Sequence, residues 1–260
     1  MPPTLHATVL GASGTELFIL HGFLGMGDNW KTLGRQWSQQ GFRVHLIDQR
    51  NHGRSFWDKT FNYAALAADV EAYRQAQGIE KCIVLGHSMG GKTAMYWACQ
   101  QSEALLGLVV ADIAPKTYPS HHQAILKGLA SLDFSQLENR KAVDAALESY
   151  IPDWGFRQFI LKNVYWEAPG QLGLRINIEV LKAAGPAVGE ALPENFSCSQ
   201  PTLFLRGETS GYILPEDQLL IQRHFPNHAL VEIAKAGHFL HAENPQQFSD
   251  VFLNWAKKLS

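Results

Sequence analysis

Short apolar runs separated by amphipathic stretches dominate the pattern of this chain. Several runs have the length and composition of buried strands. These runs are Leu17–Leu20, Val44–Ile47, Cys82–Leu85, Leu105–Ala111, Thr202–Leu205 and Ala229–Ile233. Most of the stretches between them have helical periodicity, and strands that are apolar on both faces and alternate with helices are typical of a covered parallel sheet. The pattern therefore predicts an α/β fold with a doubly wound, mostly parallel sheet.

The alternation is interrupted between residues 116 and 195. A crossover between parallel strands needs only about a dozen residues, and this segment is several times longer. Helical patterns occur at Ala124–Leu132, Lys141–Tyr150 and Ile176–Ala184, with prolines between them. We therefore expect a core of residues 1–115 and 196–260, with residues 116–195 inserted as an all-helical cap.

A nucleophile motif follows the third apolar run. Cys82–Leu85 leads directly into Gly86–Gly91, with the sequence GHSMGG, and a helical pattern begins at Lys92. This is a G-x-S-x-G elbow in the strand, turn and helix context that the motif requires. Glycines two residues before and after Ser88 suit a turn that is too sharp for side chains there. The motif predicts Ser88 as a nucleophile at a helix N-terminus, where the helix dipole favours developing negative charge.

A general base is expected near the end of the chain. A serine hydroxyl is a weak nucleophile until a base takes its proton, so a histidine should lie in a loop after a late strand. His238 follows Gly237 after the apolar run that ends at Ile233, and His241 is the alternative. We predict His238 as the base because it directly follows the loop glycine, whereas His241 could orient the helix that begins near Pro245.

Two backbone amides are expected to bind the oxyanion of the tetrahedral intermediate. One should come from Met89, the residue after the nucleophile, and the other from the loop after the first central strand. His21–Gly25 ends the run Leu17–Leu20, so we predict the Phe23 amide. The Phe23 side chain would then face the acyl pocket.

The ordered motifs resemble the signatures of the α/β-hydrolase superfamily. The segments concerned are His21–Phe23, Asp48–Ser55, Gly86–Gly91 and Gly237–His238. Within the superfamily, Gly86–Lys92 together with Val109–Pro115 resembles the small bacterial esterases of the YbfF type. The resemblance implies hydrolysis of carboxylic esters, or of thioesters, of modest size through an acyl-enzyme intermediate and without a cofactor.

The acid of the triad departs from the superfamily pattern. Many members place it after the strand that ends here at Leu205, where Ser210 occupies the position that often holds Asp. Asp112 and Glu208 remain as candidates. An acid at the end of an apolar strand is costly unless it is paired, whereas a polar loop explains Glu208 by solvation. We predict Asp112, and we expect Ser210 to add a hydrogen bond to His238.

Other polar and aromatic residues near the motifs have structural alternatives. We expect Asp48–Ser55 to be scaffolding and Lys92 to tether a loop. The cap aromatics could roof an apolar substrate pocket or form the cap's own core. These aromatics are Trp154, Phe156, Phe159, Tyr165 and Trp166. We assign Phe23, Trp154, Phe159 and Trp166 to the substrate pocket.

Composition narrows the partners. Hydrophobic residues make up 46% of the 260 positions, charged residues 18%, and the formal net charge is −2, so no strong field would attract nucleic acid or an anionic membrane. The first basic residue is Lys31, and no apolar run is long enough to span a bilayer. We expect a cytoplasmic monomer or homodimer that acts on a small molecule without a metal.

Two other functions fit the same residues. Some capped hydrolases of similar sequence use such a triad for carbon–carbon bond or proton-abstraction chemistry, and fold resemblance does not distinguish these reactions. A ligand receptor with little turnover is the alternative from a different class. Repeated turnover of a chromogenic ester would indicate an enzyme, and a single stoichiometric burst would indicate a receptor.

Overall fold

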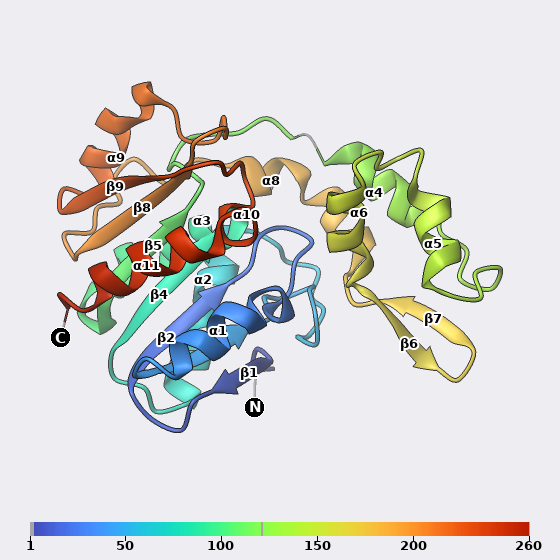
Figure 1. Cartoon of the computed structure of the whole chain (residues 1–260), viewed down its shortest axis with the longest axis horizontal. Coiled ribbons are helices and arrows are strands. Elements are labelled where there is room, and N and C mark those ends of the chain that lie inside the picture. Colours follow the sequence, from blue (N-terminus) through green and yellow to red (C-terminus); the bar gives the residue numbers. More distant parts are fainter. Residues whose placement is uncertain (1–2, 121, 260) are drawn as a thin grey trace.

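A seven-stranded sheet forms the centre of the computed structural model, which describes residues 3–120 and 122–259 (Figure 1). The strand order is β1-β3-β2-β4-β5-β8-β9, and β1 alone in this sheet is antiparallel to its neighbour. The strands are β1 (Ala7–Leu10), β2 (Thr15–Leu20), β3 (Phe42–Ile47), β4 (Cys82–His87), β5 (Leu105–Ala111), β8 (Thr202–Gly207) and β9 (His228–Ile233). The doubly wound, mostly parallel sheet is confirmed. The half-exposed edge strand β1 was not predicted, because it lacks a continuous apolar run.

Helices cover both faces of the sheet. One face packs against α1 (Lys31–Ser38) and α11 (Pro245–Ala256), and the other against α2 (Tyr63–Ala76), α3 (Met89–Gln100) and α9 (Gln218–His224). Neighbouring residues of β4 point to opposite layers, since Val84 lies in one apolar cluster and Leu85 in the other. This is why the central strands are apolar on both faces. Shorter helices are η1 (Gly27–Trp30), η2 (Ser102–Ala104), η3 (Pro215–Asp217) and α10 (Leu240–Glu243).

The segment between β5 and β8 lies beside one end of the sheet (Figure 1). It contains α4 (Gln123–Ala130), α5 (Arg140–Leu147), α6 (Trp154–Leu161), β6 (Val164–Ala168), β7 (Gln171–Leu174), α7 (Ile178–Ala183) and α8 (Gly185–Gly189). The expectation of an all-helical cap was wrong, because β6 and β7 form an antiparallel hairpin. Pro169 and Gly170 connect the two strands, and Gly170 has a φ of 78°, a combination typical of a type II turn.

Several contacts hold this cap, residues 116–195, against the core. The Asn163 side chain donates to the Leu24 carbonyl at 2.8 Å. Lys92, which lies in α3, donates to the carbonyls of Lys116 and Glu190, one at each connection of the cap. Burial lowers the pKa of Lys92 to about 7. Lys92 therefore tethers both ends of the cap to the helix that follows the nucleophile motif. Within the described residues, no helix combines the length and apolar character that a bilayer span requires.

Candidate active site

The elbow between β4 and α3 holds Ser88 in a strained backbone conformation. Ser88 stands immediately before the first residue of α3, with a φ of 52° and a ψ of −117°. A Cβ at Gly86 would lie 2.1 Å from the Gly90 carbonyl oxygen, and one at Gly90 would lie 2.2 Å from the Leu20 carbonyl oxygen. Glycine is therefore required on both sides of Ser88, because strand, helix and neighbouring loop approach one another too closely for a side chain.

Asp112 and His238 meet beside this elbow. Asp112 follows β5, is fully buried, and its Oδ2 accepts a hydrogen bond from Nδ1 of His238 at 2.8 Å. Its Oδ1 accepts from the Gly207 amide at 3.0 Å, and Oδ2 also accepts from the Ser210 hydroxyl. A proton on Nδ1 leaves Nε2 of His238 as the nitrogen that can accept a proton.

The alternative residues lie elsewhere. The Glu208 carboxylate accepts a hydrogen bond from the exposed backbone amide of Lys235 at 2.6 Å, so Glu208 stabilises the loop before His238. His241 is buried, stacks on Trp30 with ring centroids 4.0 Å apart, and burial lowers its pKa to about 3. The expectation for Ser210 was wrong in one respect, because its hydroxyl donates to Asp112 rather than to His238.

Ser88 and His238 line one cavity of about 270 Å³. Its other walls include Phe23 from the loop after β2, Phe156 and Phe159 from α6, and Phe239. Phe239 packs on Phe156 and Phe159, with ring centroids 5.8 and 5.2 Å apart. The cap therefore covers Ser88 with aromatic side chains.

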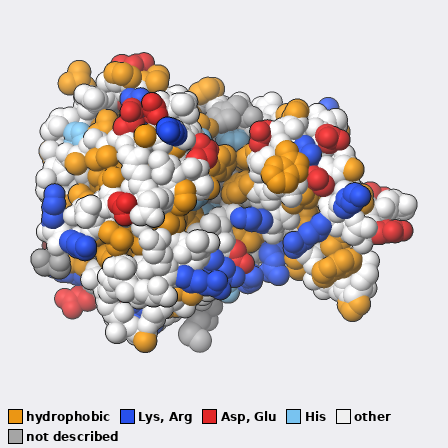
Figure 2. Space-filling view, viewed as in Figure 1, with side chains coloured by type: hydrophobic (Ala, Val, Ile, Leu, Met, Phe, Trp, Pro, Cys, Tyr) orange, Lys and Arg blue, Asp and Glu red, His pale blue; other side chains and the backbone are white. Residues whose placement is uncertain are grey.

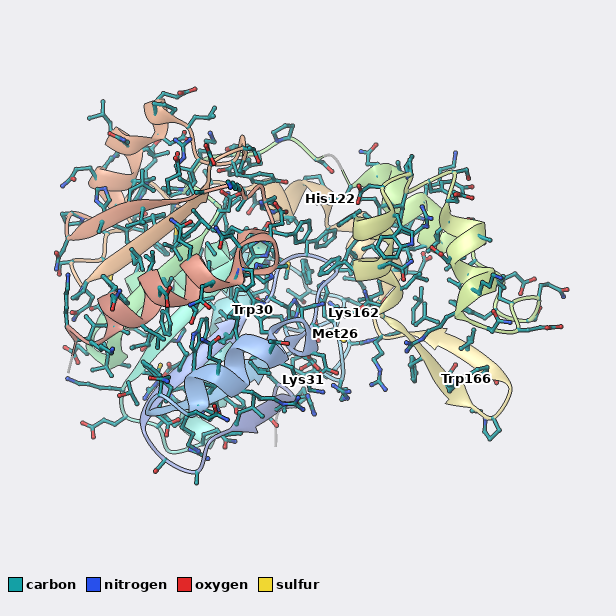
Figure 3. The ribbon with its side chains drawn as sticks, viewed as in Figure 1. Met26, Trp30, Lys31, His122, Lys162 and Trp166 are labelled. Carbon is teal, nitrogen blue, oxygen red and sulfur yellow. The ribbon has the colours of Figure 1, made fainter. Side chains whose placement is uncertain are left out.

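Two of the predicted pocket residues do not line this cavity. Trp154 is 66% exposed and Trp166 is 54% exposed. Trp154 begins α6 on a different face from Phe156 and Phe159. Trp166 belongs to the β6–β7 hairpin, which extends away from the core (Figure 3). Assigning Trp154 and Trp166 to the pocket was therefore a mistake.

Two further residues position His238, and sequence reasoning missed both. His87 is buried, its Nε2 lies 2.7 Å from the His238 carbonyl oxygen, and burial lowers its pKa well below the ordinary value, so the neutral ring donates through Nε2. Tyr212 stacks on the His238 ring at a centroid distance of 3.8 Å. The position of His87 inside the G-x-S-x-G motif could have indicated it, whereas Tyr212 has no comparable signal.

The loop after β2 is held by buried neutral histidines. Nε2 of His21 accepts from the Gln49 amide at 3.0 Å, and Nε2 of His52 accepts from the Leu24 amide at 3.2 Å. Burial lowers the pKa of His21 to about 4 and that of His52 to about 3, so both rings remain acceptors. Phe23 lies between these anchors. The Asp48–Ser55 block thus supports the loop that carries Phe23.

Met89 is the other residue whose backbone amide we predict to bind the oxyanion. It is the first residue of α3, where a backbone N–H has no acceptor within the helix. Met89 lines a small cavity that also touches Ser88. Among the described residues, no group of three or more His, Cys, Asp or Glu side chains could hold a metal ion.

Comparison with known proteins identifies the family. The model of the α/β-hydrolase fold family matches residues 16–147, and the chain is 33% identical to the Escherichia coli K12 esterase YbfF over 238 residues. That match covers 90% of this chain and 89% of YbfF. The chain belongs to the α/β-hydrolase family.

Other proteins resemble this chain over similar lengths. The mouse sn-1-specific diacylglycerol lipase ABHD11 is 34% identical over 241 residues, which cover 90% of this chain and 78% of that protein. The structure of a marine microorganism esterase matches with a TM-score of 0.94 and 36% identity, and covers 97% of this chain and 99% of that one.

Proposed function

We propose that this α/β hydrolase cleaves carboxylic esters with Ser88 as nucleophile, His238 as general base and Asp112 as the acid that orients it. The observation that carries the proposal is the 2.8 Å contact between Asp112 and His238, because it fixes the tautomer of a histidine that shares a cavity with the elbow serine. The similarity to proteins named as esterases and lipases supports the same reaction.

The arrangement assigns a step to each group. Ser88 Oγ bonds to the carbonyl carbon while Nε2 of His238 takes its proton. The amides of Phe23 and Met89 bind the oxyanion, and the N-terminus of α3 adds its dipole. His238 then gives the proton to the leaving alcohol, and water attacks the acyl-enzyme with His238 again as base. Asp112 stabilises the imidazolium that forms in each half of the cycle.

We further propose that the substrates are small esters or thioesters. The cavity at Ser88 has about 270 Å³ and is closed on one side by Phe23 and on another by Phe156 and Phe159. A cavity of this size lies just below the range of about 300–1,000 Å³ that is usual for small-molecule sites. No step of the proposed mechanism requires a cofactor.

Replacing Ser88 by alanine tests the proposed function. We expect Ser88→Ala to abolish turnover of p-nitrophenyl acetate and labelling by a fluorophosphonate, while its thermal unfolding temperature remains at or above that of the wild type. Loss of the hydroxyl removes the nucleophile, and the strained turn gains no new atom. Turnover by Ser88→Ala above a tenth of the wild-type rate would exclude Ser88 as the nucleophile.

A further inference from the structure

Ser88 lies at the junction of two cavities of very different size. The cavity on the side of His238 and Phe239 has about 270 Å³, and the other, lined by Met89 and Val188, has about 20 Å³. A volume of about 15 Å³ is already the minimum for one water-sized group, so the smaller cavity accepts little more than a methyl or ethyl group. The two substituents of a bound ester therefore meet very different limits.

His238 determines which substituent faces which cavity. It lines the larger cavity and does not line the smaller one. When the tetrahedral intermediate collapses, the bond from carbon to the alcohol oxygen breaks, and the proton taken from Ser88 passes from His238 to that oxygen. The alcohol oxygen must then lie within hydrogen-bond reach of the ring. The alcohol group occupies the larger cavity, and the acyl group points to the smaller one. Phe23 lines the larger cavity, so in this arrangement its side chain faces the alcohol group and not, as expected from the sequence, the acyl group.

The larger cavity borders an open groove. A space of about 420 Å³ shares Phe156, Phe159 and Phe239 with it and extends along α6 to Lys162 and Asn29. Figure 3 shows Lys162 at the end of α6 on the side of Met26 and Trp30. The space-filling view is notched between core and cap, with hydrophobic side chains visible in the notch (Figure 2). The groove therefore lies where a long apolar alcohol group would extend beyond the larger cavity.

The walls of the smaller cavity are held by hydrogen bonds between core and cap and by one within the cap. The Tyr63 hydroxyl donates to the Val188 carbonyl at 2.6 Å, and the Tyr118 amide donates to the Gly189 carbonyl at 2.8 Å. Lys92 donates to the next carbonyl, that of Glu190. Widening this cavity would break contacts that also anchor the cap, so we expect it to remain small when substrate binds.

We propose that the enzyme selects esters that combine an acetyl or propionyl group with a long apolar alcohol group, which lies in the groove along α6. This inference rests on the proposed function, in which Ser88 is the nucleophile and His238 protonates the alcohol. Among the small esters proposed above, the position of the carbonyl within the molecule then decides which ones are preferred.

Two isomeric esters test the inference directly. Hexyl acetate and ethyl hexanoate have the same composition and differ in which side of the carbonyl carries the long chain. We expect kcat/KM for hexyl acetate to exceed that for ethyl hexanoate by at least tenfold. A ratio of one or below, with p-nitrophenyl acetate still hydrolysed, overturns the inference alone. If none of the three esters is hydrolysed, both the proposed function and the inference are overturned.

Two matched variants test which cavity wall produces each substrate preference. Val188→Ala enlarges the smaller cavity and keeps the backbone carbonyl that Tyr63 binds, so the ratio of kcat/KM for ethyl butanoate to that for ethyl acetate should rise several-fold. Phe159→Ala removes an aromatic wall of the groove, so kcat/KM for hexyl acetate should fall relative to that for ethyl acetate. The ratio of kcat/KM for ethyl butanoate to that for ethyl acetate should stay at the wild-type value. Thermal unfolding verifies that both variants fold. The reverse pattern, with Phe159→Ala admitting the longer acyl chain, contradicts the assignment.

Discussion

Asp112 shows how a single buried carboxylate is stabilised beside the candidate site. It has no exposed surface, and the groups that donate to it are the Gly207 amide, the Ser210 hydroxyl and Nδ1 of His238. A buried ionised carboxylate without such donors would be strongly destabilising. The same hydrogen bonds that stabilise Asp112 thus hold it against His238.

The acid can be identified by comparing Asp112→Asn with Glu208→Gln. An amide at position 112 donates to Nδ1 of His238 and favours the tautomer with its proton on Nε2, which cannot accept the proton of Ser88. We expect kcat to fall by a factor on the order of 10³–10⁴. Glu208→Gln retains an oxygen for the Lys235 amide and should stay within about twofold of the wild type. The measurement is kcat on p-nitrophenyl acetate, and a larger loss in Glu208→Gln would refute the assigned triad.

At the scale of elements, the crossing of β4 and α3 fixes the position of Ser88, the proposed nucleophile. The two elements approach so closely that Gly86 faces the backbone of Gly90, and Gly90 faces that of Leu20. Two backbone hydrogen bonds complete the elbow: the Ser88 amide donates to the Ala111 carbonyl, and the Lys92 amide donates to the Ser88 carbonyl. These contacts hold Ser88 in its strained conformation.

We expect Gly86→Ala to lower the free energy of unfolding by about 1–3 kcal/mol or more, because its methyl group would lie 2.1 Å from the Gly90 carbonyl oxygen. Gly211→Ala is the matched control. No atom lies within 4 Å of the position of a Cβ at Gly211, so the change should stay within about 0.5 kcal/mol. Urea denaturation of both variants measures the difference, and equal stabilities would show that the crossing tolerates a side chain.

Sequence reasoning succeeded where the signal is local. The run Cys82–Leu85 followed by the glycines around Ser88 specifies strand, turn and helix within a few residues, and the structure has all three. The choice of Asp112 used a similar local argument, the cost of an unpaired acid at the end of an apolar strand.

Features that depend on distant contacts were missed or misassigned. The direction of Trp154 and Trp166 depends on how the cap lies against the core, and both side chains are exposed. Tyr212 reaches His238 only through the folded chain. The β6–β7 hairpin had a readable signal in Pro169 and Gly170, but the prolines were interpreted as breaks between helices.

Across the whole molecule, histidines that stay neutral surround the site. His21 and His52 hold the loop after β2. His87 binds the backbone carbonyl of His238, and His241 stacks on Trp30. Burial lowers the pKa to about 4 for His21, to about 3 for His52 and His241, and well below the ordinary value for His87. The site is thus built on groups that resist protonation in the folded protein.

This predicts acid-sensitive stability. Between pH 6.5 and about 4 the unfolded chain binds protons at these histidines and the folded protein does not, so the free energy of unfolding decreases as the pH falls through this window. Each histidine contributes a slope of up to about 1.4 kcal/mol per pH unit. His241→Phe preserves an aromatic ring against Trp30 and removes one of these titratable groups. The free energy of unfolding of this variant should therefore decrease less steeply below pH 6.5 than that of the wild type, and the difference in slope should correspond to about one bound proton. Urea denaturation at pH 7, 6 and 5 measures both slopes, and identical slopes would show that His241 takes up a proton in the folded state.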